Sequence, residues 1–94
     1  MELSERYIKI LEDEGFSSVY EWQDTPGTVY KERSHKGKVS LCLTDGSITF
    51  EFSGEKKELI APIRFDVAVG VRHSAVVGPK GAIYIIGEEI EGDS

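Results

Sequence analysis

The side chains best suited to chemistry in this sequence are two histidines, His35 and His73, and an arginine, Arg33, two residues before the first of them. An imidazole can bind a transition metal, exchange hydrogen bonds or transfer a proton near neutral pH. A guanidinium is always charged and donates hydrogen bonds to carboxylates and phosphates. Residues 30–46, YKERSHKGKVSLCLTDG, therefore predict a metal site, an anion site or simply a basic strand.

Metal-independent catalysis has little support in the sequence. Cys42 has the opposite strand parity from Val39, Leu41 and Leu43, so we expect it to face away from any site that those residues line. There is no glycine-rich phosphate loop and no Ser/His/Asp order typical of hydrolases. One cysteine and two histidines also exclude an internal disulfide and the Cys/His frameworks of structural zinc sites.

Composition narrows the range of partners. The chain has 94 residues, of which 39% are hydrophobic, and a formal net charge of −6. Such an acidic chain is poorly suited to the backbone of a nucleic acid or to an anionic membrane surface. No run approaches the ~18 apolar residues of a membrane span, and we expect no targeting segment. We therefore expect a cytoplasmic protein whose partner is a small molecule or another protein.

Residues 1–15 are expected to form one short helix. Ser4 is suited to cap its start, and Gly15 is suited to close its end. Apolar residues recur at helical spacing, which predicts a stripe that packs on the rest of the molecule. The stripe consists of Leu3, Tyr7, Ile8 and Leu11.

Residues 16–88 are predicted to form a β-barrel, because the apolar period changes from that of a helix to that of strands after Gly15. Residues 39–52 are predicted to form a hairpin with its turn at TDGS, and residues 74–86 another with its turn at GPKG. Roughly seven or eight short strands predict a small barrel or closed sandwich. We expect a single domain over residues 1–94, with a frayed tail at 89–94.

A regular spacing runs through residues 27–46, where Gly27 is followed after five residues by Arg33-x-His35, after three more by Val39 and after six more by Gly46. The same spacing, without a gap, occurs in a known motif that consists of a glycine, five residues, His-x-His, three or four residues, a glutamate, six residues and a glycine. That motif is the first motif of the cupin superfamily, which this chain therefore resembles.

The second cupin motif is matched in spacing too, although only Gly70 and His73 keep the expected residue, while Pro62, Ala68 and Val77 occupy other positions. The resemblance implies a small all-β barrel of the double-stranded β-helix type after the short helix. It also implies a homodimer. Residues 74–86 have apolar residues on both faces of the predicted strands, which agrees with one face packing in the core and the other contacting a second copy of the chain.

The resemblance further implies a metal site at the barrel mouth, at positions that hold Arg33, His35, Val39 and His73 in this chain. A guanidinium repels a cation and has no lone pair to donate, and Val39 removes a carboxylate ligand. Catalytic metal sites usually have three protein ligands. No cofactor is therefore firmly predicted, and His35 and His73 would hold a divalent transition metal only weakly.

We therefore expect a cupin-like barrel with a degenerate metal site that binds a small polar or anionic molecule at Arg33, His35, Val39 and His73. One alternative is a metal-dependent enzyme of the oxygenase or isomerase class that uses His35 and His73. Another is an altered or redesigned barrel that has lost its original activity. The residues leave open whether the protein is an enzyme.

An inward-facing Arg33 requires a partner for its charge. That partner is either an anionic group of the ligand or a protein carboxylate such as Asp66 or Glu32. Tyr20 and Trp22 lie on one face of a predicted strand and are expected in the core, at an interface or on the wall of a binding cavity.

Overall fold

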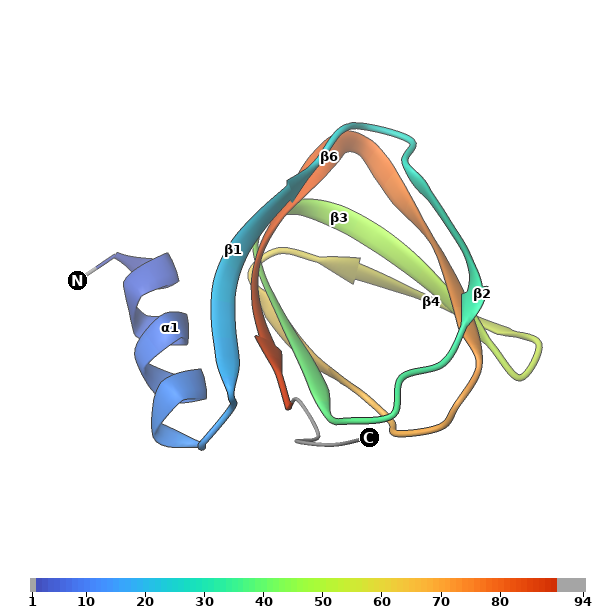
Figure 1. The fold of residues 1–94 in the computed structure, drawn as a ribbon. Helices are drawn as coiled ribbons and strands as arrows, with labels where there is room; N and C mark the ends of the chain where they lie inside the picture. Colours follow the sequence, from blue (N-terminus) through green and yellow to red (C-terminus); the bar gives the residue numbers. More distant parts are fainter. Residues whose placement is uncertain (1, 90–94) are drawn as a thin grey trace.

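The computed structural model describes residues 2–89, which form one helix followed by six strands (Figure 1). The all-β barrel preceded by a short N-terminal helix is confirmed. Residues 90–94, most of the predicted frayed tail, lie outside the described residues. The elements are α1 (Leu3–Asp13), β1 (Ser18–Asp24), β2 (Val29–Arg33), β3 (Val39–Phe52), β4 (Glu55–Ile60), β5 (Ile63–Val67) and β6 (His73–Glu88).

Two long antiparallel strands, β3 and β6, organise the barrel. The first half of β3 also pairs with β5, and the second half of β6 also pairs with β1. The other half of β3 pairs with β4, and the other half of β6 pairs with β2. All six strands belong to one sheet, and the long strands change neighbours where they bend. The sheet therefore folds into two halves, called the two sheets below, which curve around a common interior (Figure 1).

Both predicted hairpins are wrong. Residues 39–52 form the single strand β3, and residues 73–88 form the single strand β6. The TDGS and GPKG segments lie where these strands bend, and the register between the strands shifts between Leu43 and Asp45 and again between Gly46 and Ile48. Residues typical of turns here allow a bend within a strand that stays paired on both sides of the bend. The described chain consequently has six strands instead of seven or eight.

The bend in β3 depends on Gly46. Its φ is positive at 79°, a conformation that side chains other than glycine rarely adopt. A Cβ at this position would also overlap the carbonyl oxygen of Gly81 on β6. The close approach of the two long strands therefore requires a glycine.

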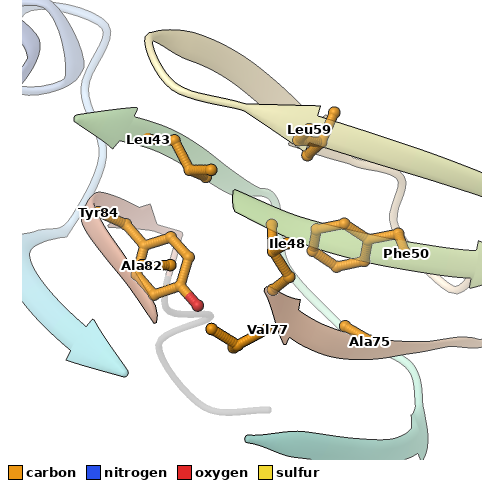
Figure 2. Packing of buried hydrophobic residues seen from close by; sticks show 8 residues of the cluster. All are labelled: Leu43, Ile48, Phe50, Leu59, Ala75, Val77, Ala82 and Tyr84. Atoms are coloured by element: carbon orange, nitrogen blue, oxygen red, sulfur yellow. The ribbon is translucent and has the colours of Figure 1, made fainter. Parts of the chain in front are cut away.

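The inner faces of the two sheets bury an apolar core, which Figure 2 shows with side chains from β3, β4 and β6 pointing toward one another. Four of its members, from the two long strands, also line the cavity described below, so the core forms part of the cavity wall. The cluster consists of Leu43, Ile48, Phe50, Leu59, Ala75, Val77, Ala82 and Tyr84.

Helix α1 packs on the outside of the barrel, beside β1 (Figure 1). Its Leu11 is fully buried in a cluster with Cys42 and Ile85. Gly87 provides the space for this contact, because a Cβ there would lie only 3.1 Å from a methyl group of Leu11. The predicted apolar stripe thus has a defined partner on the barrel.

The ends of α1 are set by local hydrogen bonds and by one ion pair. The helix is capped by Glu2, whose amide donates to the Glu5 carboxylate at 3.4 Å, and not by Ser4 as predicted. Gly15 adopts a positive φ of 92° at the other end, as expected. Arg64 on β5 donates to both carboxylate oxygens of Glu14, which ties this end to the barrel. Within residues 2–89, no helix has the length and apolar content that a membrane crossing requires.

Candidate functional site

A cavity of about 400 Å³ lies between the two sheets of the barrel. The structure brings the four residues singled out in the sequence, Arg33, His35, Val39 and His73, together on its wall. The rest of the wall is mainly apolar and aromatic. It includes Trp22, Tyr30, Leu41, Phe50, Tyr84 and Ile86.

The ends of three strands position these four residues. Arg33 ends β2 and pairs with His73 at the start of β6, while Val39 begins β3. His35 lies on the link between β2 and β3. This link is fixed because the Gly70 amide donates to the His35 carbonyl oxygen at 2.9 Å.

Arg33 lies at the exposed mouth of the cavity. Its guanidinium carbon is 5.4 Å from the centroid of the Tyr30 ring, a distance suited to a cation–π contact. Within residues 2–89 it forms no ion pair with a carboxylate. The guanidinium therefore lies beside a neutral ring, and no side chain within residues 2–89 accepts a hydrogen bond from it.

Both carboxylates considered as partners for Arg33 have other partners. Asp66 accepts a hydrogen bond from Arg64 at 2.9 Å, and Glu32 forms an ion pair with Arg72 at 3.1 Å. Of the partners left open for Arg33 by the sequence, neither Asp66 nor Glu32 is therefore ion-paired with it.

The two histidines are stacked, with ring centroids 5.0 Å apart and ring planes at 26°. His73 also lies against Phe50, and its Nδ1 is 3.2 Å from the Val71 carbonyl oxygen. A proton on Nδ1 can be donated to that oxygen, which leaves the lone pair on Nε2. Burial, the charge of Arg33 and the neighbouring His73 lower the pKa of His35, so its imidazole is neutral at neutral pH.

A buried carboxylate orders the aromatic side of the cavity. Asp24, only 8% exposed, accepts hydrogen bonds from the Tyr84 hydroxyl at 2.5 Å and from the Tyr30 hydroxyl at 2.7 and 2.8 Å. The Trp22 indole donates to it at 3.0 Å. Burial and the hydrogen bonds to Asp24 raise the pKa of Tyr30 and Tyr84, so both phenols stay protonated and remain donors.

Glu88, at the end of β6, is the acidic side chain among the described residues that line the cavity. Its Oε1 accepts a hydrogen bond from the Tyr20 hydroxyl at 2.7 Å. Burial and this hydrogen bond raise the pKa of Tyr20 to about 12. Tyr20 and Trp22 thus belong to the cavity wall, the last of the three places expected for them.

Asp24 and Glu88 were not predicted as site residues, although their positions in the alternating pattern of their strands place both on the inward face. Asp24 has the strand parity of Tyr20 and Trp22, and Glu88 has that of Ile86. Acidic residues on the inward face of a strand are unusual enough to mark a site.

The described residues do not fit the metal site that the cupin resemblance implies. The two stacked imidazoles share the cavity wall with an arginine, and Val39 occupies the position at which the resemblance implies a carboxylate. In the part of the chain that the structure describes, no three His, Cys, Asp or Glu side chains are grouped so that they could hold a metal ion.

Cys42 faces away from the cavity, as its parity predicted. It is completely buried beneath α1 with Leu11 and Ile85. Burial raises its pKa to about 11, which makes it a poor nucleophile at neutral pH.

The topology and the cavity at the strand ends define a barrel of the cupin class, and solved structures share this fold. KdgF from Halomonas sp. superposes with a TM-score of 0.65 at 19% identity, over 80% of this chain and 70% of that one. An RmlC-like cupin from Shewanella frigidimarina gives 0.65 at 20% identity, over 80% and 68%. The cupin domain of Schizosaccharomyces pombe Cnp3 gives 0.70 at 14% identity, over 83% and 55%. The chain therefore has the cupin fold.

Sequence comparison adds no closer relationship, since no protein-family profile and no curated protein sequence matches the chain. Homodimerisation also stays a prediction. The apolar residues of both parities in residues 74–86 are partly explained within one chain, because Ile85 is covered by α1. Val76 remains 49% exposed on the outer face, opposite Val29 on β2.

Proposed function

We propose that this cupin barrel binds a small polar or anionic organic molecule in its cavity without a metal, and that Arg33 contacts the negative group of that molecule. The observation that supports this proposal is that Arg33, unlike two other arginines, has no described ion-pair partner. It lines the cavity and has no carboxylate partner within residues 2–89, whereas Arg64 and Arg72 are both ion-paired. A guanidinium in this setting favours a carboxylate or phosphate.

The size and chemistry of the cavity support an organic ligand. Its volume of about 400 Å³ lies within the range of sites for small molecules. The walls are apolar and aromatic, while the neutral imidazole of His35 and the ring of His73 supply hydrogen-bonding groups. This mixture suits a compound that combines a polar head with an apolar body.

Calorimetric titration with small carboxylates and phosphates tests the proposal. Arg33→Met should weaken the binding of a carboxylate that binds the wild type by at least about tenfold, which corresponds to one charge-assisted hydrogen bond. Arg72→Met is the matched control, because Arg72 is ion-paired to Glu32 and does not line the cavity. The proposal fails if no such compound binds, or if Arg33→Met binds as well as the wild type.

The metal-dependent alternative has no arrangement of described residues in its favour and is tested separately. Elemental analysis followed by thermal-shift titration with divalent transition metals should find no bound metal and no stabilisation of the wild type. A variant with Arg33→His and Val39→Glu supplies the positive control, because it places ligands at all four motif positions on the cavity wall. A metal that raises the melting temperature of the wild type would contradict the proposal.

A further inference from the structure

The cavity wall carries two opposite charges that do not neutralise each other. Arg33 and Glu88 both line the cavity, yet they form no ion pair. Arg33 lies against the Tyr30 ring, and one oxygen of Glu88 is bound by the Tyr20 hydroxyl. Among residues 2–89, no side chain donates to the second Glu88 oxygen. The two charges are therefore held apart by neutral aromatic partners.

Both charges lie at the same end of the barrel, around His35. Glu88 pairs with Val39 in the register of β6 and β3, and the next amide, that of Glu89, donates to the Lys38 carbonyl oxygen at 2.9 Å. These contacts place the end of β6 beside the link that carries His35. The pKa of His35 responds to both groups, since Arg33 lowers it and Glu88 raises it.

A pair of separated opposite charges selects for a ligand with the complementary pair. A simple anion is attracted by Arg33 but repelled by Glu88, and a simple cation meets the reverse. A zwitterion is attracted by both groups. A compound with only one of the two charges gains one attraction and meets one repulsion, so it should bind more weakly. Beyond the charged end, Leu41, Phe50 and Ile86 make the cavity apolar.

We propose that the cavity selects a small zwitterion with an apolar substituent, of the chemical class of α-amino acids with large apolar side chains. Arg33 binds the carboxylate, Glu88 binds the ammonium group, and the apolar substituent enters the barrel. This inference rests on the proposed function, because it names the class of molecule that the same cavity takes.

Three compounds with the same phenyl group test the contribution of each charge to binding. Phenylalanine has both charges, 3-phenylpropanoate lacks the ammonium group, and 2-phenylethylamine lacks the carboxylate. Calorimetry on the wild type should show phenylalanine binding at least about tenfold more tightly than either analogue, which is about 1.4 kcal/mol. This comparison needs no variant and so does not depend on whether a substituted chain folds.

Glu88→Gln tests the role of the carboxylate at the end of β6. The substitution should weaken the binding of phenylalanine by about tenfold. It should leave the affinity for 3-phenylpropanoate unchanged or increase it, because a charge that repels the carboxylate has been removed. Glu89→Gln is the matched control, since it changes the net charge equally at a neighbouring residue that does not line this cavity. That variant should keep the wild-type preference.

The failures of the two proposals can be distinguished. If 3-phenylpropanoate binds the wild type as tightly as phenylalanine, or Glu88→Gln leaves their ratio unchanged, the zwitterion inference is overturned. A loss of 3-phenylpropanoate binding in Arg33→Met would then still support the proposed anchor. If none of the three compounds binds, this inference is wrong, and the wider carboxylate and phosphate titration decides the proposed function.

Discussion

At the scale of single residues, the carboxylate of Asp24 accepts hydrogen bonds from three aromatic side chains of the cavity wall. We expect Asp24→Asn to lower the free energy of unfolding by about 2–3 kcal/mol, because buried donors lose a charged acceptor. Urea unfolding measures the change. Asp45→Asn, at an exposed position on β3, should change stability by less than about 0.5 kcal/mol. Equal effects of the two substitutions would contradict this role of Asp24.

His35 gives the barrel a pH dependence of known sign. Burial, Arg33 and His73 lower its pKa below the usual 6.5, so the unfolded chain binds this proton more readily than the folded chain. The contribution of the neutral His35 to the stability of the folded state is complete above pH 6.5. It is lost as the pH falls toward the pKa of His35 in the folded state. The free energy of unfolding of the wild type should therefore decrease relative to that of His35→Gln as the pH falls below about 6.5. An NMR titration giving His35 a pKa above 6.5 would refute this.

Single residues also show where prediction from the sequence stops. Arg33, His35, Val39 and His73 could be assigned to one site because motif spacing and strand parity fix which side each one faces. The charge partners could not be assigned. Hydrogen bonds such as that from Tyr20 to Glu88 join residues 68 positions apart, which no local pattern records.

At the scale of elements, the long strands β3 and β6 explain why two hairpins were predicted wrongly. Asp, Gly, Pro and Ser residues mark a bend as readily as a turn, because both need glycine at positive φ and a break in alternation. What distinguishes them is continued pairing on both sides of the bend, as at Gly46, which pairs with Ala82. That pairing depends on the whole barrel, so the sequence predicts the fold class better than the strand count.

The bend at Gly46 can be tested against another glycine of the same conformation. Gly46→Ala should cost about 2–4 kcal/mol, because backbone strain is joined by overlap with the Gly81 carbonyl oxygen. Gly54 has a φ of 77° but nothing within 4 Å of a Cβ, so Gly54→Ala should cost only about 1 kcal/mol. Chemical denaturation compares the two variants, and similar losses would argue against the close approach of β3 and β6.

Helix α1 protects Cys42, and this cover can be measured by thiol reactivity. With a pKa of about 11 and no exposure, Cys42 should react with a disulfide reagent far more slowly in the native protein than in denaturant. Leu11→Ala should speed that reaction and cost about 2–4 kcal/mol of stability. Ile10→Ala, on the exposed face of the same helix, is the control. Fast labelling of the native wild type would contradict the packing.

At the scale of the whole molecule, the net charge of −6 gives a poor guide to the ligand, because binding depends on the charges that line the cavity. The chain has the cupin fold, and Arg33 and Val39 occupy two of the positions at which the resemblance implies metal ligands. We propose that an organic molecule, and not a metal ion, lies beside Arg33 and the two histidines.

Diffraction from crystals grown without added metal and with saturating phenylalanine tests that claim most directly. We predict electron density for the amino acid in the cavity, with its carboxylate on Arg33 and its ammonium group on Glu88, and no anomalous signal from a metal. A metal ion between His35 and His73, or a cavity without bound ligand under these conditions, would contradict it.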